Sequence, residues 1–119
     1  MKPKSVSELD LANFTGTEHW HKHSLMKRVL YTDGAQYVAE QCGAYWLLDE
    51  IATAQLIKRV SAEEFQCWKL DVPSNTALLT CDDGNGRVVF AKEIEYTDFP
   101  EGEMTLYFAD NVILLPSEY

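Results

Sequence analysis

The sequence predicts an α+β fold, in which a helical N-terminal half packs on one face of a four- to five-stranded antiparallel meander sheet formed by the C-terminal half. Two observations indicate this class. Apolar residues follow helical spacing in the segment that ends near Val60. From Phe65 onward they alternate with polar residues, in short runs separated by turn residues. Helices gathered on one face of an antiparallel sheet are the α+β layer arrangement.

The length of the chain indicates one domain. The 119 residues contain no internal repeat and no Gly/Ser-rich or Pro-rich linker. A chain of this size buries enough surface for an apolar core without a structural metal or disulfides. We therefore expect residues 1–119 to form a single globular domain.

Three helical segments are expected in the first half. In "SVSELDLANF", Ser5 and Glu8 have the spacing of a capping box, which predicts a short helix. "LYTDGAQYVAEQCG" leads into a second helix, with Asp33 as N-cap and Gly43 at the C-terminal end. "AYWLLDEIATAQLIKRV" has the strongest helical apolar spacing and predicts one continuous helix.

The second half predicts strands in "FQCWKLDV", "TALLTC", "RVVFAKEIEYTDF", "MTLYFA" and "VILLP". "DDGNG" between the second and third of these is typical of a hairpin connection. Lys92 interrupts the apolar side of the third strand, which indicates a bulge, a strand end or a snorkelling side chain. Trp46, Trp68 and Phe90 are expected between the helices and the sheet.

The charge of the chain is acidic and uneven. The net charge is -9; residues 1–31 carry five bases and three acids, and residues 32–119 carry five bases and sixteen acids. This charge opposes direct binding to nucleic acid. It is typical of a charge that keeps a protein in solution, and the alternatives are an acidic face for a basic protein partner or a mimic of nucleic acid. The acids of "EIEYTDFPEGE" are the candidate interaction surface, and the alternative is a solvated face. They are Glu93, Glu95, Asp98, Glu101 and Glu103.

Several classes of protein are not indicated. No apolar run is long enough for a transmembrane helix, and the first residues lack the apolar region of a signal peptide. The three cysteines form no CxxC pair, so we expect buried thiols and a cytoplasmic location without a membrane partner. No GxSxG, P-loop, GxGxxG or HExxH motif occurs, and no cofactor is expected.

The stretch "HWHKH" is the candidate metal or acid–base site. In an extended segment His19, His21 and His23 point to one side and could bind zinc or a similar ion. In a helix only His19 and His23 share a face. The alternative is a polar segment in which Trp20 packs on the domain and the histidines have no chemical role.

Aromatic residues offer a third candidate site. Tyr45, Trp46 and Trp68 could line a small-ligand pocket between helices and sheet, although core packing is the commoner role of such residues. Three hypotheses for function follow. The first is a non-enzymatic protein-interaction domain with an acidic surface, and the second is a metal- or histidine-dependent enzyme centred on the three histidines. The third is a small-ligand binder.

Several phrases of the chain carry a resemblance to a known family. "LANFTGTEHW", "LYTDGAQYVAEQCGAYWLLDEIA", "FQCWKL", "LTCDDGNG", "IEYTDFP" and "LLPSEY" occur here in this order, over roughly Leu9 to Tyr119. In these phrases the chain resembles a small family of bacterial single-domain proteins that is known only as a domain of unknown function. The resemblance implies one compact domain in a bacterial context and assigns no activity, cofactor or catalytic residue.

Overall fold

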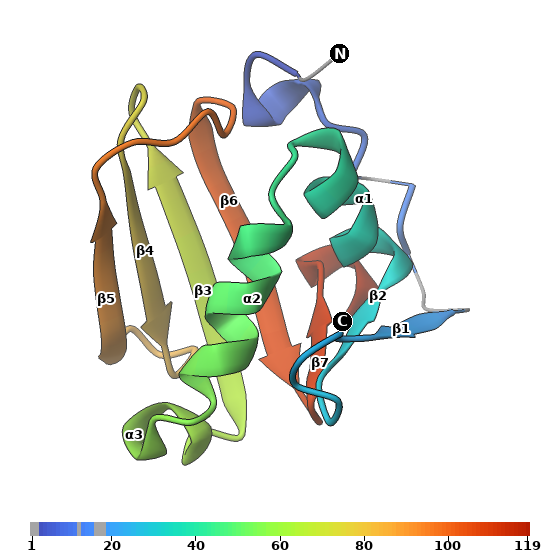
Figure 1. Cartoon of the computed structure of the whole chain (residues 1–119), viewed down its shortest axis with the longest axis vertical. Coiled ribbons are helices and arrows are strands. Elements are labelled where there is room, and N and C mark those ends of the chain that lie inside the picture. The colour runs from blue at the N-terminus through green and yellow to red at the C-terminus, as the bar shows by residue number, and fades with distance from the viewer. Residues whose placement is uncertain (1–2, 12, 16–18) are drawn as a thin grey trace.

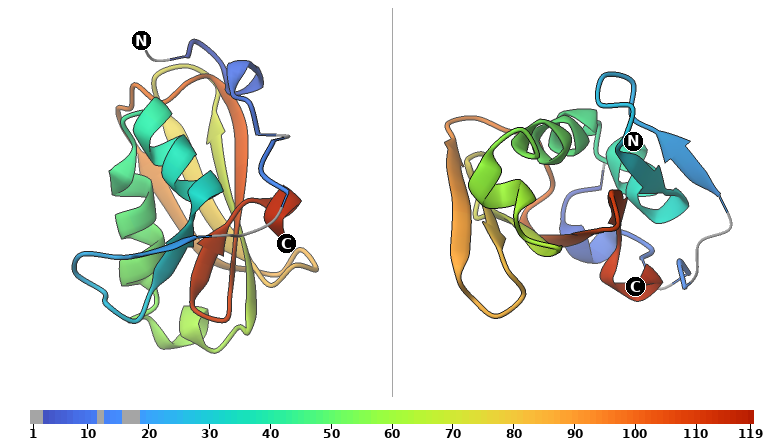
Figure 2. Two further views of the ribbon diagram at one scale, coloured as in Figure 1. Left: turned by 90° about the vertical axis from the view of Figure 1, so that its right-hand side faces the viewer. Right: turned by 90° about the horizontal axis from the view of Figure 1, so that it is seen from below.

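The fold is built on a seven-stranded sheet with α-helices on one of its faces (Figures 1 and 2). The computed structural model describes residues 3–11, 13–15 and 19–119. In sheet order the strands are β1 (Trp20–Lys22), β2 (Leu30–Thr32), β7 (Val112–Leu114), β6 (Gly102–Ala109), β3 (Phe65–Val72), β4 (Ala77–Asp82) and β5 (Val88–Ile94). The helices are α1 (Asp33–Gln41), α2 (Tyr45–Ala54) and α3 (Lys58–Ser61), and short 3₁₀ turns cover Val6–Glu8 and Pro116–Glu118.

The predicted fold class was wrong in its account of the sheet. The sheet is mixed, because β2 runs parallel to β7 while the other neighbouring strands are antiparallel. The N-terminal half is not purely helical: it supplies β1 and β2, and the helices lie mostly in the middle of the chain. Each of these two strands has only three residues, which is too short for alternation to be recognised.

The order of the remaining strands also departs from a meander. β6 does not lie beside β5, its predecessor in sequence, but pairs with β3 over the full length of both strands. The segment between β5 and β6 therefore passes the ends of β4 and β3, as Figure 1 shows. β3 becomes a central strand with hydrogen-bonded partners on both sides. The β4–β5 hairpin at "DDGNG" forms as predicted.

The helix boundaries follow side-chain hydrogen bonds that are only partly visible in sequence. Thr32, not Asp33, is the N-cap of α1, and its hydroxyl accepts the Ala35 N–H at 3.2 Å. Gly43 follows α1 with a φ of 59°, which suits glycine after a helix. The single helix predicted from Ala44 onward was wrong, because α2 ends at Ala54 and α3 is a separate turn.

A buried amide explains where α2 stops. Gln66 on β3 is fully buried, and its amide forms a two-way pair with Gln55, with both N···O distances 2.8 Å. Its Nε2 also donates to the Val60 carbonyl, and its Oε1 accepts the Trp68 indole N–H at 2.9 Å. The segment after α2 is thereby tied to β3, since an unpaired amide in this position would be costly.

The layer between helices and sheet contains the expected aromatic residues. Trp68 is buried and packs against Phe90 with ring centroids 5.3 Å apart, and Trp46 packs edge-on against Phe99. Lys92 lies on the same side of β5, where its ammonium pairs with Glu50 of α2 at 2.6 Å. The lysine that interrupts the apolar pattern is therefore a link between the edge strand and a helix.

The C-terminal turn is joined to the start of α1 by one carboxylate. Glu118 accepts the Thr32 hydroxyl at 2.6 Å, the Gly34 N–H at 3.2 Å and the Leu115 N–H at 2.9 Å. Only 9% of this residue is exposed. A Cβ on Gly34 would lie 2.4 Å from Glu118 Oε1 and 2.6 Å from Leu115 Cδ1. Glycine is therefore the residue that lets the carboxylate reach the helix.

We predict that Gly34→Ala lowers the free energy of unfolding by about 2 kcal/mol, because the pinned carboxylate must move and lose hydrogen bonds. Helix propensity alone predicts the opposite sign, a gain of about 1 kcal/mol. Denaturant unfolding measures the difference, with Gln41→Ala at the exposed end of α1 as the control. If the Gly34→Ala protein is as stable as the parent, the space between Gly34 and the side chains of Glu118 and Leu115 is large enough for a methyl group, which would contradict the prediction.

Candidate functional site

The two faces of the sheet differ in what covers them. The α-helices of the described chain pack on one face, which we call the inner face, and the other is the outer face (Figure 2). Because side chains alternate along a strand, the register assigns each residue to a face. Trp68 and Leu70 of β3 point inward, so Lys69 and Asp71 point outward. Side chains on the outer face are candidates for contact with a partner.

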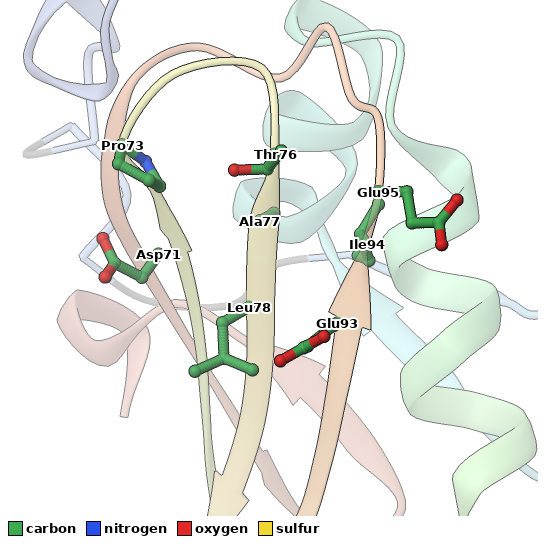
Figure 3. A pocket seen from close by; sticks show the side chains of 8 residues that line it. All are labelled: Asp71, Pro73, Thr76, Ala77, Leu78, Glu93, Ile94 and Glu95. Atoms are coloured by element: carbon green, nitrogen blue, oxygen red, sulfur yellow. The ribbon is translucent and has the colours of Figure 1, made fainter.

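An acidic row crosses the outer face near one end of the sheet. The register places Glu103 of β6 opposite Asp71 of β3, Asp71 opposite Leu78 of β4, and Leu78 opposite Glu93 of β5. We call these four residues the acidic row. Figure 3 shows Leu78 between the carboxylates of Asp71 and Glu93. Leu78 is 42% exposed, and a shallow cavity of about 450 Å³ lies here.

The acids of the acidic row have no ion-pair partner within the described residues. Asp71 and Glu103 are direct cross-strand partners, and like charges in that position are destabilising. Within the described residues, Asp71, Glu93 and Glu103 form no ion pair. Lys69 is the next side chain along the same face of β3, but it forms no ion pair with the acids of the row. The row therefore presents negative charge beside an exposed apolar side chain.

The five acids predicted as an interaction surface do not all lie together. Glu93 and Glu103 belong to the acidic row, whereas Glu95 lines the same cavity but extends away from Leu78 (Figure 3). Asp98 is exposed in the connection after β5, and the Glu101 carbonyl accepts the Val6 N–H. Sequence reasoning missed Asp71. Its signal was the alternation within "FQCWKLDV", which places Asp71 on the face opposite Leu70.

The histidine stretch is extended, but its imidazoles reach two different carboxylates. Residues 20–22 form β1. His19 Nδ1 lies 3.3 Å and His21 Nε2 lies 2.8 Å from the two oxygens of Asp33 at the start of α1. His21 also stacks on Tyr31 of β2 with ring centroids 5.3 Å apart. These two histidines bind the edge strand to the helix.

His23 is separate from the other two histidines. It is 3% exposed, and its Nδ1 accepts the backbone N–H groups of Leu25 and Met26 at 3.2 and 3.0 Å. The ring hydrogen must therefore be on Nε2, which donates to Asp49 of α2 at 2.7 Å. Both ring nitrogens of His23 therefore have hydrogen-bond partners within the protein. His23 organises the turn between β1 and β2 and fastens it to α2.

The described part of the chain contains no group of three or more His, Cys, Asp or Glu side chains arranged to hold a metal ion. It also contains no helix long and apolar enough to span a membrane. His19 and His21 share Asp33, and the third histidine of the predicted set is directed to Asp49. The structure thus brings together two of the three predicted ligands.

The aromatic residues predicted as pocket walls occupy three different settings. Trp68 is buried in the core, and Tyr45 is exposed with its hydroxyl donating to Glu40 at 3.2 Å. Trp46 lines a cavity of about 260 Å³ with Tyr96 at the end of the sheet. Burial, with a contribution from Glu40, raises the pKa of Tyr45. Core packing accounts for Trp68.

The cysteines are buried thiols rather than nucleophiles. Burial raises the pKa of Cys81 to about 12 and, with the nearby Asp82 carboxylate, also raises that of Cys67. Cys42 is completely buried. Since the thiolate is the reactive form, these positions favour packing over catalysis.

Comparison with protein families assigns the chain to a family. Residues 6–119 match the family described as "Family of unknown function (DUF6876)". The chain belongs to this family. No curated protein and no solved structure matches it. The match confirms the resemblance to a family without an assigned activity, so a functional hypothesis for this member of the family must rest on the geometry above.

We predict that Asp33→Asn destabilises the protein more at about pH 5 than at about pH 3. The His21 hydrogen bond holds the pKa of Asp33 below its usual value of 3.8, against the opposing effect of burial. A lowered pKa in the folded state stabilises at pH values above the unfolded pKa, and this contribution is lost as the pH falls through the folded pKa. Thermal melting at both pH values tests this. The effect should shrink when His19 and His21 are replaced by alanine; an undiminished effect would exclude the histidines as its cause.

We predict that a thiol reagent such as dithionitrobenzoate reacts slowly with the native protein at about pH 8 and titrates three thiols after unfolding. The physical reason is the burial of the cysteines and the raised pKa of Cys81 and Cys67. Ser74→Cys, at an exposed position after β3, is the control for reagent access. Rapid native labelling of the parent protein would contradict the burial.

Proposed function

We propose that this domain binds a basic protein through the outer face of its sheet, with the acidic row as the main contact. The observation that carries the proposal is the cross-strand pair Asp71 and Glu103, two like charges held opposite each other on a face that no α-helix of the described chain covers. A cationic partner would relieve their repulsion, which gives the complex a specific electrostatic gain.

The shape of the site supports an extended basic segment. Leu78 stands between carboxylates, and the exposed Pro73 adds to the apolar lining of the same cavity (Figure 3). Lysine and arginine have long apolar stems below their charged ends. A segment lying on this face could place such stems on Leu78 and its charged ends at Asp71 and Glu93.

The proposal also fits the overall charge and a cytoplasmic location. A net charge of -9 steers basic partners toward the domain and repels phosphate backbones. Three buried thiols are typical of proteins in a reducing compartment.

The test uses a short peptide of alternating lysine and valine, whose lysines lie on one side when it is extended. We expect the double variant Asp71→Asn, Glu103→Gln to weaken its binding about fivefold, because two partly exposed contacts are each worth about 0.5 kcal/mol. Isothermal titration at low and high salt measures the affinity. Binding to the parent protein should weaken as salt rises.

The control is the double variant Glu40→Gln, Glu64→Gln, which removes the same charge from exposed positions on α1 and after α3. It should change the affinity by less than about twofold, since exposed charges at a distance are screened. The Asp71/Glu103 variant should also be slightly more stable than the parent, because the cross-strand repulsion is gone. Equal weakening by both variants would mean that only net charge matters and would refute a defined site.

A further inference from the structure

A second feature of the outer face is an aromatic cleft at the end of the sheet formed by β1, β2 and β7. Its volume is about 550 Å³. In register terms, Trp20 of β1 is opposite Thr32 of β2, and Leu30 of β2 is opposite Val112 of β7. Leu30, Val112 and Leu114 line the cleft together with Trp20 and Tyr119. We call this feature the Trp20 cleft.

The two aromatic walls are exposed and differ in how they are held. Trp20 is 60% exposed and Tyr119 is 73% exposed. Tyr119 packs edge-on against Phe65 and Tyr107, with ring centroids 5.2 and 5.6 Å apart. These two contacts place the Tyr119 ring beside Phe65 and Tyr107. Exposed aromatic rings beside aliphatic side chains mark binding sites more often than isolated exposed residues do.

The cleft is negatively charged. Its lining includes two acids, Asp110 and Glu118, and no base. Glu118 is the buried carboxylate at the start of α1; its three hydrogen bonds come from a hydroxyl and two backbone N–H groups, none of which neutralises its charge. Within the described residues it has no ion-pair partner. Lys22, on the outer side of β1, is exposed and lies outside the lining.

We propose that the Trp20 cleft receives the cationic end of a lysine or arginine side chain from the same basic partner. A cation over an aromatic face is attracted by the electrons of the ring, and tryptophan is the strongest such partner. The carboxylates of Asp110 and Glu118 add charge complementarity, which an uncharged side chain would not use. This inference rests on the proposed function, because both sites lie on the outer face of one sheet.

The test uses three short acetylated peptides that are identical except for a central lysine, trimethyl-lysine or norleucine. Norleucine keeps the apolar stem and removes the charge. Amide chemical shifts of Leu30 and Val112, on the floor of the cleft, report binding in nuclear magnetic resonance titrations. We expect both cationic peptides to bind at least about threefold more tightly than the norleucine peptide.

Three variants separate the contributions to the cleft. Trp20→Leu should reduce the preference for cationic peptides, with the carboxylates supplying what remains, and Trp20→Phe should retain more of it because a ring face remains. Asp110→Asn should weaken only the cationic peptides; asparagine tolerates the φ of 54° at this position, so the turn is kept. Trp20 is exposed, and circular dichroism checks that both of its variants fold.

The outcomes distinguish the cleft from the acidic row. Equal binding of the lysine and norleucine peptides would show that the cleft binds the apolar stem and would overturn the proposed cationic ligand. If no peptide changes the amide chemical shifts of Leu30 and Val112, the cleft is refuted as a site. If the Asp71/Glu103 variant weakens the lysine–valine peptide while the cleft variants do not, the further inference fails and the proposed function stands. If only the cleft variants matter, the proposed function fails and the cleft remains.

Discussion

The N-terminal part of the sheet depends on the hydrogen bonds that the carboxylate of Glu118 accepts. It joins the last turn of the chain to Thr32 and Gly34, where β2 becomes α1. β2 is held beside β7 by only two register pairs, so little else fixes this parallel contact. Because a buried carboxylate is costly without hydrogen bonds, its three donors define one arrangement of the two segments. β1, its histidines and the Trp20 cleft all lie beyond this junction.

The two faces of the sheet differ in what packs on them. On the inner face, Gln66 and Gln55 tie the end of α2 to β3, and Lys92 with Glu50 ties α2 to the edge strand. Polar contacts of this kind hold the helices at one position on the sheet. Both the acidic row and the Trp20 cleft lie on the opposite face. An extended basic partner on that face would meet negative charge at one end of the sheet and aromatic rings at the other.

Part of the candidate site could be predicted from the sequence. The acids of "EIEYTDFPEGE" stood out because they lie close together without a base, and Glu93 of β5 and Glu103 of β6 do reach the outer face. Asp71 joins them through the pairing of β3 with β6, strands that are distant in sequence. Tyr119 reaches the cleft through Glu118, whose partners lie near Thr32. Single-sequence patterns contain no information about such non-local pairings.

The sequence by itself determined the local elements: the alternation that forms β3, the hairpin at "DDGNG" and the apolar stripe of α2. These elements depend on interactions between residues that are close in the chain, so the sequence is enough to predict them. Only the tertiary structure decided that β6 lies beside β3, that β2 runs parallel to β7 and that His23 is fastened to Asp49. These pairings and contacts depend on which apolar surfaces, distant in sequence, bury one another, and on which buried polar groups form hydrogen bonds with each other.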